Sequence, residues 1–158
     1  MIRIGIIGCG HWGPNHIRVF NQQSDTPVKT CADLDEKRLG AIHANYPAVT
    51  ITRDYRDILK DPDIDTVCIS TPTSTHFSLS REALEAGKNV FCEKPLAMKA
   101  EECQQLEVLA AERKKILMVG HVFVFNKGIV KTKEYLQSGE LGKIHYAHSE
   151  RTNLGPFR

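Results

Sequence analysis

The chain has 158 residues, of which 41% are hydrophobic and 25% are charged, and its formal net charge is +2 at pH 7. This length leaves room for one good hydrophobic core, or for one domain and part of another. The composition is ordinary for a soluble globular protein, and the small net charge favours no nucleic-acid partner. We find no signal peptide and no apolar run of membrane-spanning length, so we expect a cytoplasmic protein that does not contact membranes.

The five cysteines are odd in number and form no C-x-x-C pair. Four of them fall in or beside expected strands, where a free cysteine packs as a small hydrophobic residue. This pattern favours a reducing compartment and no disulfide framework. A zinc site made of Cys9, His11 and His16 is an alternative that we do not favour, so we expect no metal.

The N-terminal stretch predicts a dinucleotide-binding unit. An apolar strand runs into a G-x-G-x-x-G turn, a helix and a second strand follow, and Asp33 stands about 20 residues beyond the last glycine. The glycines allow a tight turn and close approach of a pyrophosphate, whose charge the helix N-terminus attracts. Asp33 would accept hydrogen bonds from the adenosine ribose and repel a 2′-phosphate, which favours NAD over NADP. The expected elements are strand 2–7, helix 15–23 and strand 28–32, and the expected cofactor residues of the turn are Gly8, Gly10, His11, Trp12 and Gly13.

Two plainer interpretations remain open for this stretch. The glycines can form a turn without any ligand, since glycine-rich turns are common, and Asp33 can be an ordinary loop acid.

Strands and helices alternate as far as residue 120. Buried strands without polar alternation are typical of parallel sheets, and right-handed crossovers place helices on both faces. The pattern predicts an α/β fold with a Rossmann-type, doubly wound, mostly parallel sheet. The further expected helices are 34–45, 54–60, 76–86 and 99–114, and the further strands are 49–51, 66–70, 89–92 and 116–120.

The pattern changes from His121 onward. We expect a helix over 128–137, a turn at Gly139 and Gly142, and a strand over 143–151. One strand cannot bury a sheet face alone, so this part predicts the first helix and strand of an incomplete α+β second domain. The expected domains are 1–120, which binds the cofactor, and 121–158, the start of a truncated substrate and oligomerisation domain.

A second loop is expected at the carboxyl edge of the sheet, where ligands bind in open α/β folds. Thr71 and Thr73 can hydrogen-bond a ribose or phosphate, and Pro72 fixes the backbone so that the loop can lie beneath the cofactor. His76 at the next helix start could contact the nicotinamide side. Satisfaction of its ring by the backbone is an equally open alternative.

Glu93-Lys94-Pro95 follows a strand at the same edge. A lysine beside a nicotinamide would be partly desolvated and near positive charge, and both effects favour the neutral amine. It could then hydrogen-bond a substrate hydroxyl and assist its deprotonation. Glu93 could orient Lys94 or hold the nicotinamide ribose. In isolation, a surface Glu-Lys pair before a turn proline is the simpler alternative.

Several motifs along the chain together carry a family resemblance. They are Gly8 to Gly13, Ala32-Asp33, Thr71-Pro72 with His76, Ala86-Gly87-Lys88-Asn89-Val90, Glu93-Lys94-Pro95 and Gly120-His121. In this order and spacing the chain resembles the Gfo/Idh/MocA oxidoreductases, the relatives of glucose–fructose oxidoreductase and inositol dehydrogenase. The resemblance implies that Lys94 is catalytic, that the Lys94–Pro95 peptide is cis and that full-length members form homo-oligomers.

The chain departs from this family in length, because members are roughly twice as long. By the resemblance, their second domain supplies an Asp/His pair that works with the lysine, and those residues would lie beyond Arg158. We therefore expect the chain to bind NAD but to show little or no turnover by itself.

Within the family, the segments 120–126 and 149–155 look like the nucleotide-sugar branch, which includes the UDP-N-acetylglucosamine-type 3-dehydrogenases. Asn126 is also a natural helix N-cap, which is the plainer interpretation of that residue. The candidate substrate-binding residues that this resemblance implies are Lys94, His121, Asn126, Arg151 and Asn153.

The leading hypothesis is therefore the N-terminal part of an NAD-dependent dehydrogenase. It would oxidise a secondary hydroxyl of a sugar or nucleotide sugar by hydride transfer to NAD, with Lys94 assisting proton removal. The alternatives are a non-catalytic NAD-binding module that senses redox state or docks on a partner, and a truncated product without a physiological role.

Overall fold

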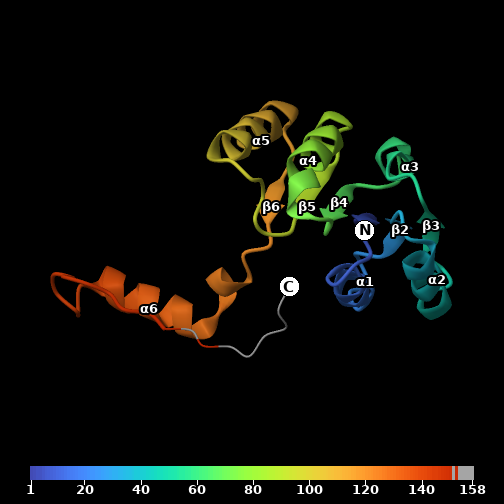
Figure 1. Cartoon of the computed structure of the whole chain (residues 1–158). Helices are drawn as coiled ribbons and strands as arrows, with labels where there is room; N and C mark the ends of the chain where they lie inside the picture. Colours follow the sequence, from blue (N-terminus) through green and yellow to red (C-terminus); the bar gives the residue numbers. More distant parts are fainter. Residues whose placement is uncertain (151, 153–158) are drawn as a thin grey trace. The chain divides into compact units, whose positions relative to one another are not determined.

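A computed structural model describes residues 1–150 and 152, and the chain divides into two compact units, Met1–His121 and Val122–Arg158 (Figure 1). Each unit is described by itself. The first unit alternates strands and helices throughout, as the sequence predicts. Its elements are β1 (Ile4–Ile7), α1 (Gly13–Asn21), β2 (Val28–Ala32), α2 (Glu36–Asn45), β3 (Thr50–Thr52), α3 (Arg56–Lys60), β4 (Thr66–Ile69), a 3-10 turn (Thr73–Thr75), α4 (His76–Glu85), β5 (Asn89–Cys92), α5 (Ala100–Arg113) and β6 (Leu117–Val119).

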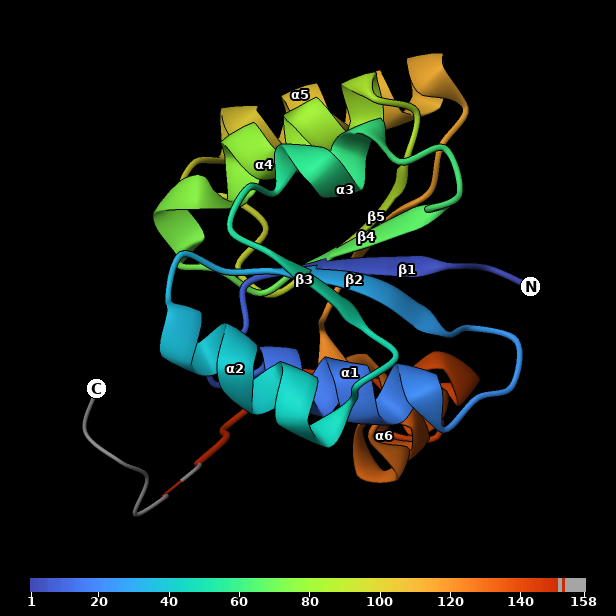
Figure 2. The same ribbon diagram turned by 90° about the vertical axis from the view of Figure 1, so that its right-hand side faces the viewer.

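The six strands form one parallel sheet in the order β3-β2-β1-β4-β5-β6. The chain starts at the centre, moves outward to β3, returns to β4 beside β1 and then continues to β6. Figure 2 shows α1 and α2 on one face of the sheet and α3, α4 and α5 on the other. This is the Rossmann-type, doubly wound α/β sheet that the sequence predicts, and all its strands end at the same edge.

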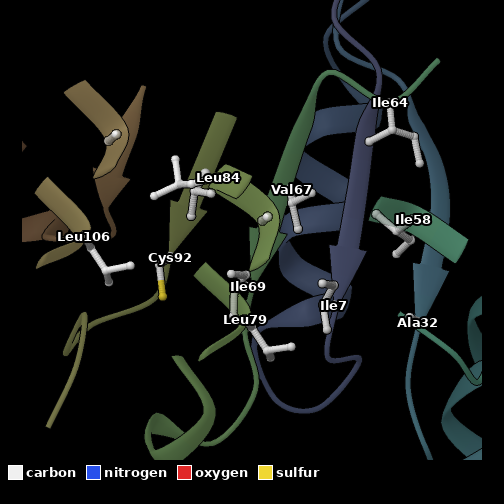
Figure 3. Packing of buried hydrophobic residues seen from close by; sticks show 13 residues of the cluster. Ile7, Ala32, Ile58, Ile64, Val67, Ile69, Leu79, Leu84, Cys92 and Leu106 are labelled. Carbon is white, nitrogen blue, oxygen red and sulfur yellow. The ribbon is translucent and has the colours of Figure 1, made fainter. Parts of the chain in front are cut away.

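Two apolar clusters pack the helices onto the sheet. Ile6 and Ile7 are neighbours in β1 but belong to different clusters, because successive side chains of a strand point to opposite faces. Figure 3 shows the cluster on the α4 side, where Ile69 of β4 lies near Leu79 and Leu84. The sheet is thus buried on both faces, which explains why its strands lack a polar alternation.

The cysteines belong to this packing. All five are free, and every one except Cys103 is buried, as predicted. Burial raises the pKa of the Cys92 thiol to about 12. It also raises the pKa of the Cys68 thiol well above its ordinary value. Thiols in this state stay protonated and behave as small apolar side chains.

Local signals place the helix ends close to the predicted positions. Asp35 caps α2 by accepting hydrogen bonds from the backbone N–H groups of Lys37 at 2.9 Å and Arg38 at 3.4 Å. Gly87 follows α4 with a φ of +75°, as a C′ glycine does. The main difference is α1, which begins at Gly13 itself. In the described part of the chain, no helix combines the length and apolar character that crossing a membrane requires.

The second unit contains a 3-10 turn (Val122–Phe125) and α6 (Lys127–Ser138), followed by a turn at Gly139 and Gly142. The predicted strand over 143–151 is wrong for its described part, since residues 143–150 have no strand structure; Arg151 lies outside the described residues. A strand needs a partner for its backbone groups, and no strand is present among the described residues of this unit. All of those residues are exposed.

Candidate functional site

Three loops meet at the carboxyl edge of the sheet. They are the glycine turn 8–13 after β1, the loop 71–76 after β4 and the loop 93–95 after β5. Because β1, β4 and β5 are neighbours, their ends lie side by side, next to the point where the strand order reverses. Ligands of open α/β sheets bind at this place, so the fold brings together the segments that the sequence analysis singled out.

The glycine turn has no room for side chains at two positions. Gly8 has a φ of +97°, and a Cβ there would lie 2.8 Å from the carbonyl oxygen of Ser70. The Ser70 hydroxyl in turn donates to the Gly8 carbonyl oxygen at 2.7 Å. A Cβ on Gly13 would overlap that same carbonyl oxygen, whereas one on Gly10 would meet nothing closer than Arg38 Nη1 at 3.6 Å. The turn is therefore tight where it leaves the strand and open at Gly10, as a pyrophosphate cradle requires.

The N-terminus of α1 is free to receive an anion. Trp12 occupies the N-cap position, but no side chain in the described part of the chain caps the helix, and Pro14 stands in its first turn. The unpaired N–H groups of the first turn and the helix dipole attract negative charge. His11 and Trp12, the non-glycine residues predicted to contact the cofactor, are both exposed beside this turn.

Asp33 is held at the end of β2, facing the glycine turn. Its Oδ2 accepts from the backbone N–H of Cys9 at 2.7 Å, and its Oδ1 accepts from that of Asp35 at 2.9 Å. Arg38 Nη1 lies 3.6 Å from Oδ2. Since a carboxylate oxygen can accept more than one hydrogen bond, Asp33 is positioned and still able to receive ribose hydroxyls. The sequence analysis missed Arg38, although its place in the first turn of the following helix brings it near the Asp33 carboxylate.

The loop after β4 is closed by its own hydrogen bonds. The hydroxyls of Thr71 and Thr75 are 2.7 Å apart, and Thr75 also bonds the Pro72 carbonyl oxygen through its N–H at 2.9 Å. The ring of His76 is 1% exposed, with Nδ1 2.7 Å from the Pro95 carbonyl oxygen and Nε2 2.9 Å from that of Thr71. The ring thus meets backbone carbonyl oxygens, as in the alternative considered above, and one N–H can donate to one of them. Thr73 begins the 3-10 turn at the site edge, and contacts of this loop with a cofactor stay predictions.

Glu93 and Lys94 have different surroundings, although they are adjacent in the sequence. Glu93 is buried, with Oε1 3.0 Å from Nε2 of His16 in α1. Lys94 is exposed and has no hydrogen bond or ion pair with any residue the structure describes, and its peptide bond to Pro95 is cis, as the resemblance implied. Glu93 therefore has a partner other than Lys94, which leaves the lysine amine free to meet a ligand.

His16 is a site residue for which the sequence analysis had no role beyond the zinc alternative. Burial lowers its pKa, and the Glu93 carboxylate acts in the opposite direction. The available signal was its spacing: His16 follows Gly13 by one helical turn and precedes Phe20 by another, so it lies on the helix face that meets the sheet.

The predicted substrate residues belong to different units of the chain, and their role stays a prediction. His121 ends the first unit, where its N–H donates to the Val119 carbonyl oxygen at 2.7 Å. Asn126 belongs to the second unit and caps α6, since its Oδ1 accepts from the N–H groups of Gly128 at 2.9 Å and Ile129 at 3.3 Å. Arg151 and Asn153 lie outside the described residues.

The zinc alternative finds no support in the geometry of the described residues. Cys9 is buried with its Sγ 3.9 Å from the Ala32 carbonyl oxygen, His11 is exposed, and His16 bonds Glu93. Within residues 1–150 and 152, no three histidine, cysteine, aspartate or glutamate side chains are grouped as a metal site.

Comparisons with known proteins agree with this geometry. A family model described as "Oxidoreductase family, NAD-binding Rossmann fold" matches residues 2–121. The uncharacterised oxidoreductase YrbE of Bacillus subtilis is 37% identical over 143 residues, which cover 89% of this chain and 41% of YrbE. Inositol 2-dehydrogenase of Salmonella typhimurium is 33% identical over 157 residues, covering 96% of this chain and 46% of that protein.

A solved structure is similar over the same part. It is a mutant of KijD10, a 3-ketoreductase from Actinomadura kijaniata in complex with TDP-benzene and NADP, with a TM-score of 0.81 at 26% identity, covering 90% of this chain and 44% of that one. The chain thus spans less than half the length of each of these relatives. Because the family model matches most of the sequence, the protein belongs to the Gfo/Idh/MocA family of oxidoreductases, in the part that forms the NAD-binding Rossmann fold.

Proposed function

We propose that the chain supplies the NAD site and the catalytic lysine of a dehydrogenase that oxidises a secondary hydroxyl of a sugar or nucleotide sugar. The observation that carries this proposal is the convergence of three features at one sheet edge. These are a glycine turn with no room for a Cβ at Gly8 or Gly13, the fixed carboxylate of Asp33, and the exposed amine of Lys94. Relatives named as an inositol dehydrogenase and a 3-ketoreductase support the substrate class.

Each residue has a defined task in this proposal. Gly8, Gly10 and Gly13 let the backbone approach the pyrophosphate, and the uncapped start of α1 faces its charge. Asp33 accepts the adenosine ribose hydroxyls and disfavours a 2′-phosphate, so NAD is preferred to NADP. When bound, NAD supplies the hydride acceptor.

Lys94 performs the proton chemistry. Its neutral amine accepts a hydrogen bond from the substrate hydroxyl and assists removal of that proton as the carbon–hydrogen bond breaks. Lys94 is exposed in the chain by itself, so water reaches its amine unless a bound cofactor and substrate cover it. The proposal therefore includes little or no turnover by the 158-residue chain alone.

A non-catalytic NAD-binding module is the second candidate. It is favoured by one observation: among the described residues, no acid or base is hydrogen-bonded to Lys94 that would complete a proton relay. In that case the nucleotide site would serve redox sensing or partner docking.

Titration with NAD tests the premise that both candidates share. Trp12 is the single tryptophan and stands at the start of α1, so its fluorescence should change as NAD binds, with matching heat in calorimetry. NADP should bind more weakly. A folded chain that gives neither signal would exclude both candidates, while binding without turnover in any longer form that contains this chain would favour the module.

A further inference from the structure

Glu93 is a buried acid in the candidate site, directly after β5. It directly precedes Lys94, and its side chain is 10% exposed. A buried carboxylate is costly unless it is paired or hydrogen-bonded. Nε2 of His16 lies 3.0 Å from its Oε1, although the two residues are 77 positions apart in the sequence. This contact joins α1 to the end of β5.

Aromatic packing holds the His16 ring in place for this contact. Phe91 meets the ring edge-on, with centroids 5.4 Å apart and an interplanar angle of 78°. Trp12 and Phe20 lie along the same helix face, with their ring centroids 6.2 Å and 6.4 Å from that of His16. Such pairs restrict the orientation of the ring.

Gly120 is the glycine that lies beside the carboxylate of Glu93. A Cβ on Gly120, just after β6, would lie 3.4 Å from Glu93 Oε1 and 3.4 Å from Phe91 Cζ. Because Gly120 has no side chain, it leaves the space in which the Glu93 carboxylate meets His16. The backbone N–H of Glu93 donates to the Ile69 carbonyl oxygen at 2.9 Å, so both ends of the residue are fixed.

The residue after Lys94 is held from the opposite face of the sheet. His76, the first residue of α4, lies with Nδ1 2.7 Å from the Pro95 carbonyl oxygen. Figure 2 shows α1 and α4 on opposite faces. The neighbours of Lys94 are thus each tied to a histidine from a different layer, while Lys94 itself is exposed.

We propose that His16 is a positioning residue that couples the phosphate-binding start of α1 to the loop that carries Lys94. His16 lies in the first helical turn, where its N–H donates to the Trp12 carbonyl oxygen at 3.0 Å. A ligand that orders this turn also orders the His16 ring, and through Glu93 it fixes the backbone of Lys94. The coupling of His16 to cofactor binding rests on the proposed function. The positioning of the Lys94 loop by His16 does not rest on it.

The test compares three variants of the full chain by two-dimensional amide NMR. His16→Gln keeps an N–H donor of similar reach, whereas His16→Phe keeps the ring and loses the donor. His43→Phe makes the same change at an exposed histidine of α2 and serves as the matched control. If His16→Phe does not fold, His16→Asn takes its place, because its amide is too short to reach Glu93.

The ligand-free spectra test positioning. We expect the amide signals of Glu93, Lys94 and Gly120 to move in His16→Phe and to stay near their original places in His16→Gln and His43→Phe. Unmoved signals in His16→Phe, or equal movement in His16→Gln, would overturn the proposal whether or not the chain binds NAD.

Addition of ADP tests coupling, because ADP fills an adenosine and phosphate site but lacks the nicotinamide that could touch Lys94 directly. In the original chain ADP should shift Gly10, Gly13 and also Lys94, and in His16→Phe the shift at Lys94 should fall by about half or more while those of the glycines persist. An undiminished Lys94 shift in that variant would overturn the coupling. If ADP moves neither glycine in the original chain, the proposed function fails, and the ligand-free spectra alone decide whether His16 positions the loop.

Discussion

The backbone of Lys94 is held by contacts of its two neighbours, although Lys94 itself makes no hydrogen bond or ion pair with any described residue. Its neighbours Glu93 and Pro95 are tied to His16 and His76, so the backbone is held while the amine remains exposed. This arrangement combines a defined position with a free reactive group. It is what a general base needs before its substrate arrives.

Replacing Lys94 by alanine should therefore slow the chemical step and spare NAD binding. In an active dehydrogenase that contains this chain, we expect kcat to fall by about 10² to 10⁴-fold, the usual contribution of general acid–base catalysis, with NAD affinity nearly unchanged. Steady-state kinetics and NAD titration measure the two quantities. Lys99→Ala, at an exposed lysine five residues away, is the control, and retained turnover in Lys94→Ala would remove its catalytic role.

His16 should make the stability of the chain depend on pH. Burial lowers its pKa in the folded state below the ordinary value of 6.5. The unfolded chain therefore takes up a proton first as pH falls, so the stabilisation present above about pH 6.5 is lost as pH falls through the folded pKa. Urea unfolding between pH 7.5 and pH 5 should show a steeper loss for the original chain than for His16→Gln. Equal pH dependence in the two proteins would show that this histidine does not contribute.

The structure matches the predicted helices and strands where the sequence signal lies within the element or next to it. Strand β2 and the strand β5 have the predicted bounds, Asp35 caps α2, and Gly87 ends α4. In each case the information lies within a few residues: apolar runs, a side-chain cap, or a glycine that accepts positive φ. The strand predicted over 143–151 failed in its described part because a strand also depends on a partner, which no local pattern supplies.

Two glycines on different helices offer a matched test of the cradle. An alanine Cβ at Gly13 would overlap the Gly8 carbonyl oxygen, which is backbone and cannot easily move. We expect Gly13→Ala to lower the free energy of unfolding by about 1–3 kcal/mol and to weaken NAD binding. Gly40→Ala, in α2, meets nothing within 4 Å and should stabilise the chain by about 0.5–1 kcal/mol.

Urea unfolding and NAD titration of the two variants check this pair. The opposite signs separate crowding in the cradle from the general effect of alanine in a helix. Stabilisation by Gly13→Ala without any loss of NAD affinity would contradict the assignment of this turn as the pyrophosphate site.

At the scale of the whole molecule, both apolar clusters lie within the first unit. Their members run from β1 to β6, and no described residue after His121 is buried. A unit with its own core can fold alone. Residues 1–121 are also the part that matches the family model.

A chain that ends at His121 should therefore fold cooperatively and bind NAD as the 158-residue chain does. A chain that ends at Gly87 is the contrasting control, because it lacks β5, α5 and β6 and exposes β4 as a new sheet edge. Circular dichroism, urea unfolding and NAD calorimetry distinguish the two. Failure of the 1–121 chain to fold would show that the second unit contributes to stability.

The sequence by itself determined the class of the fold, and it predicted the place of the cofactor site. Alternating apolar strands and amphipathic helices, the glycine turn and Asp33 are patterns of near neighbours, and parallel topology then requires their strand ends to share one edge. Only the tertiary structure decided the partners of the polar groups: Glu93 bonds His16 rather than Lys94, and the His76 ring lies between two backbone carbonyl oxygens. These contacts join residues that are far apart in the sequence and that the order of the strands brings together. The spacing of residues along the sequence does not predict which of them will meet in this way.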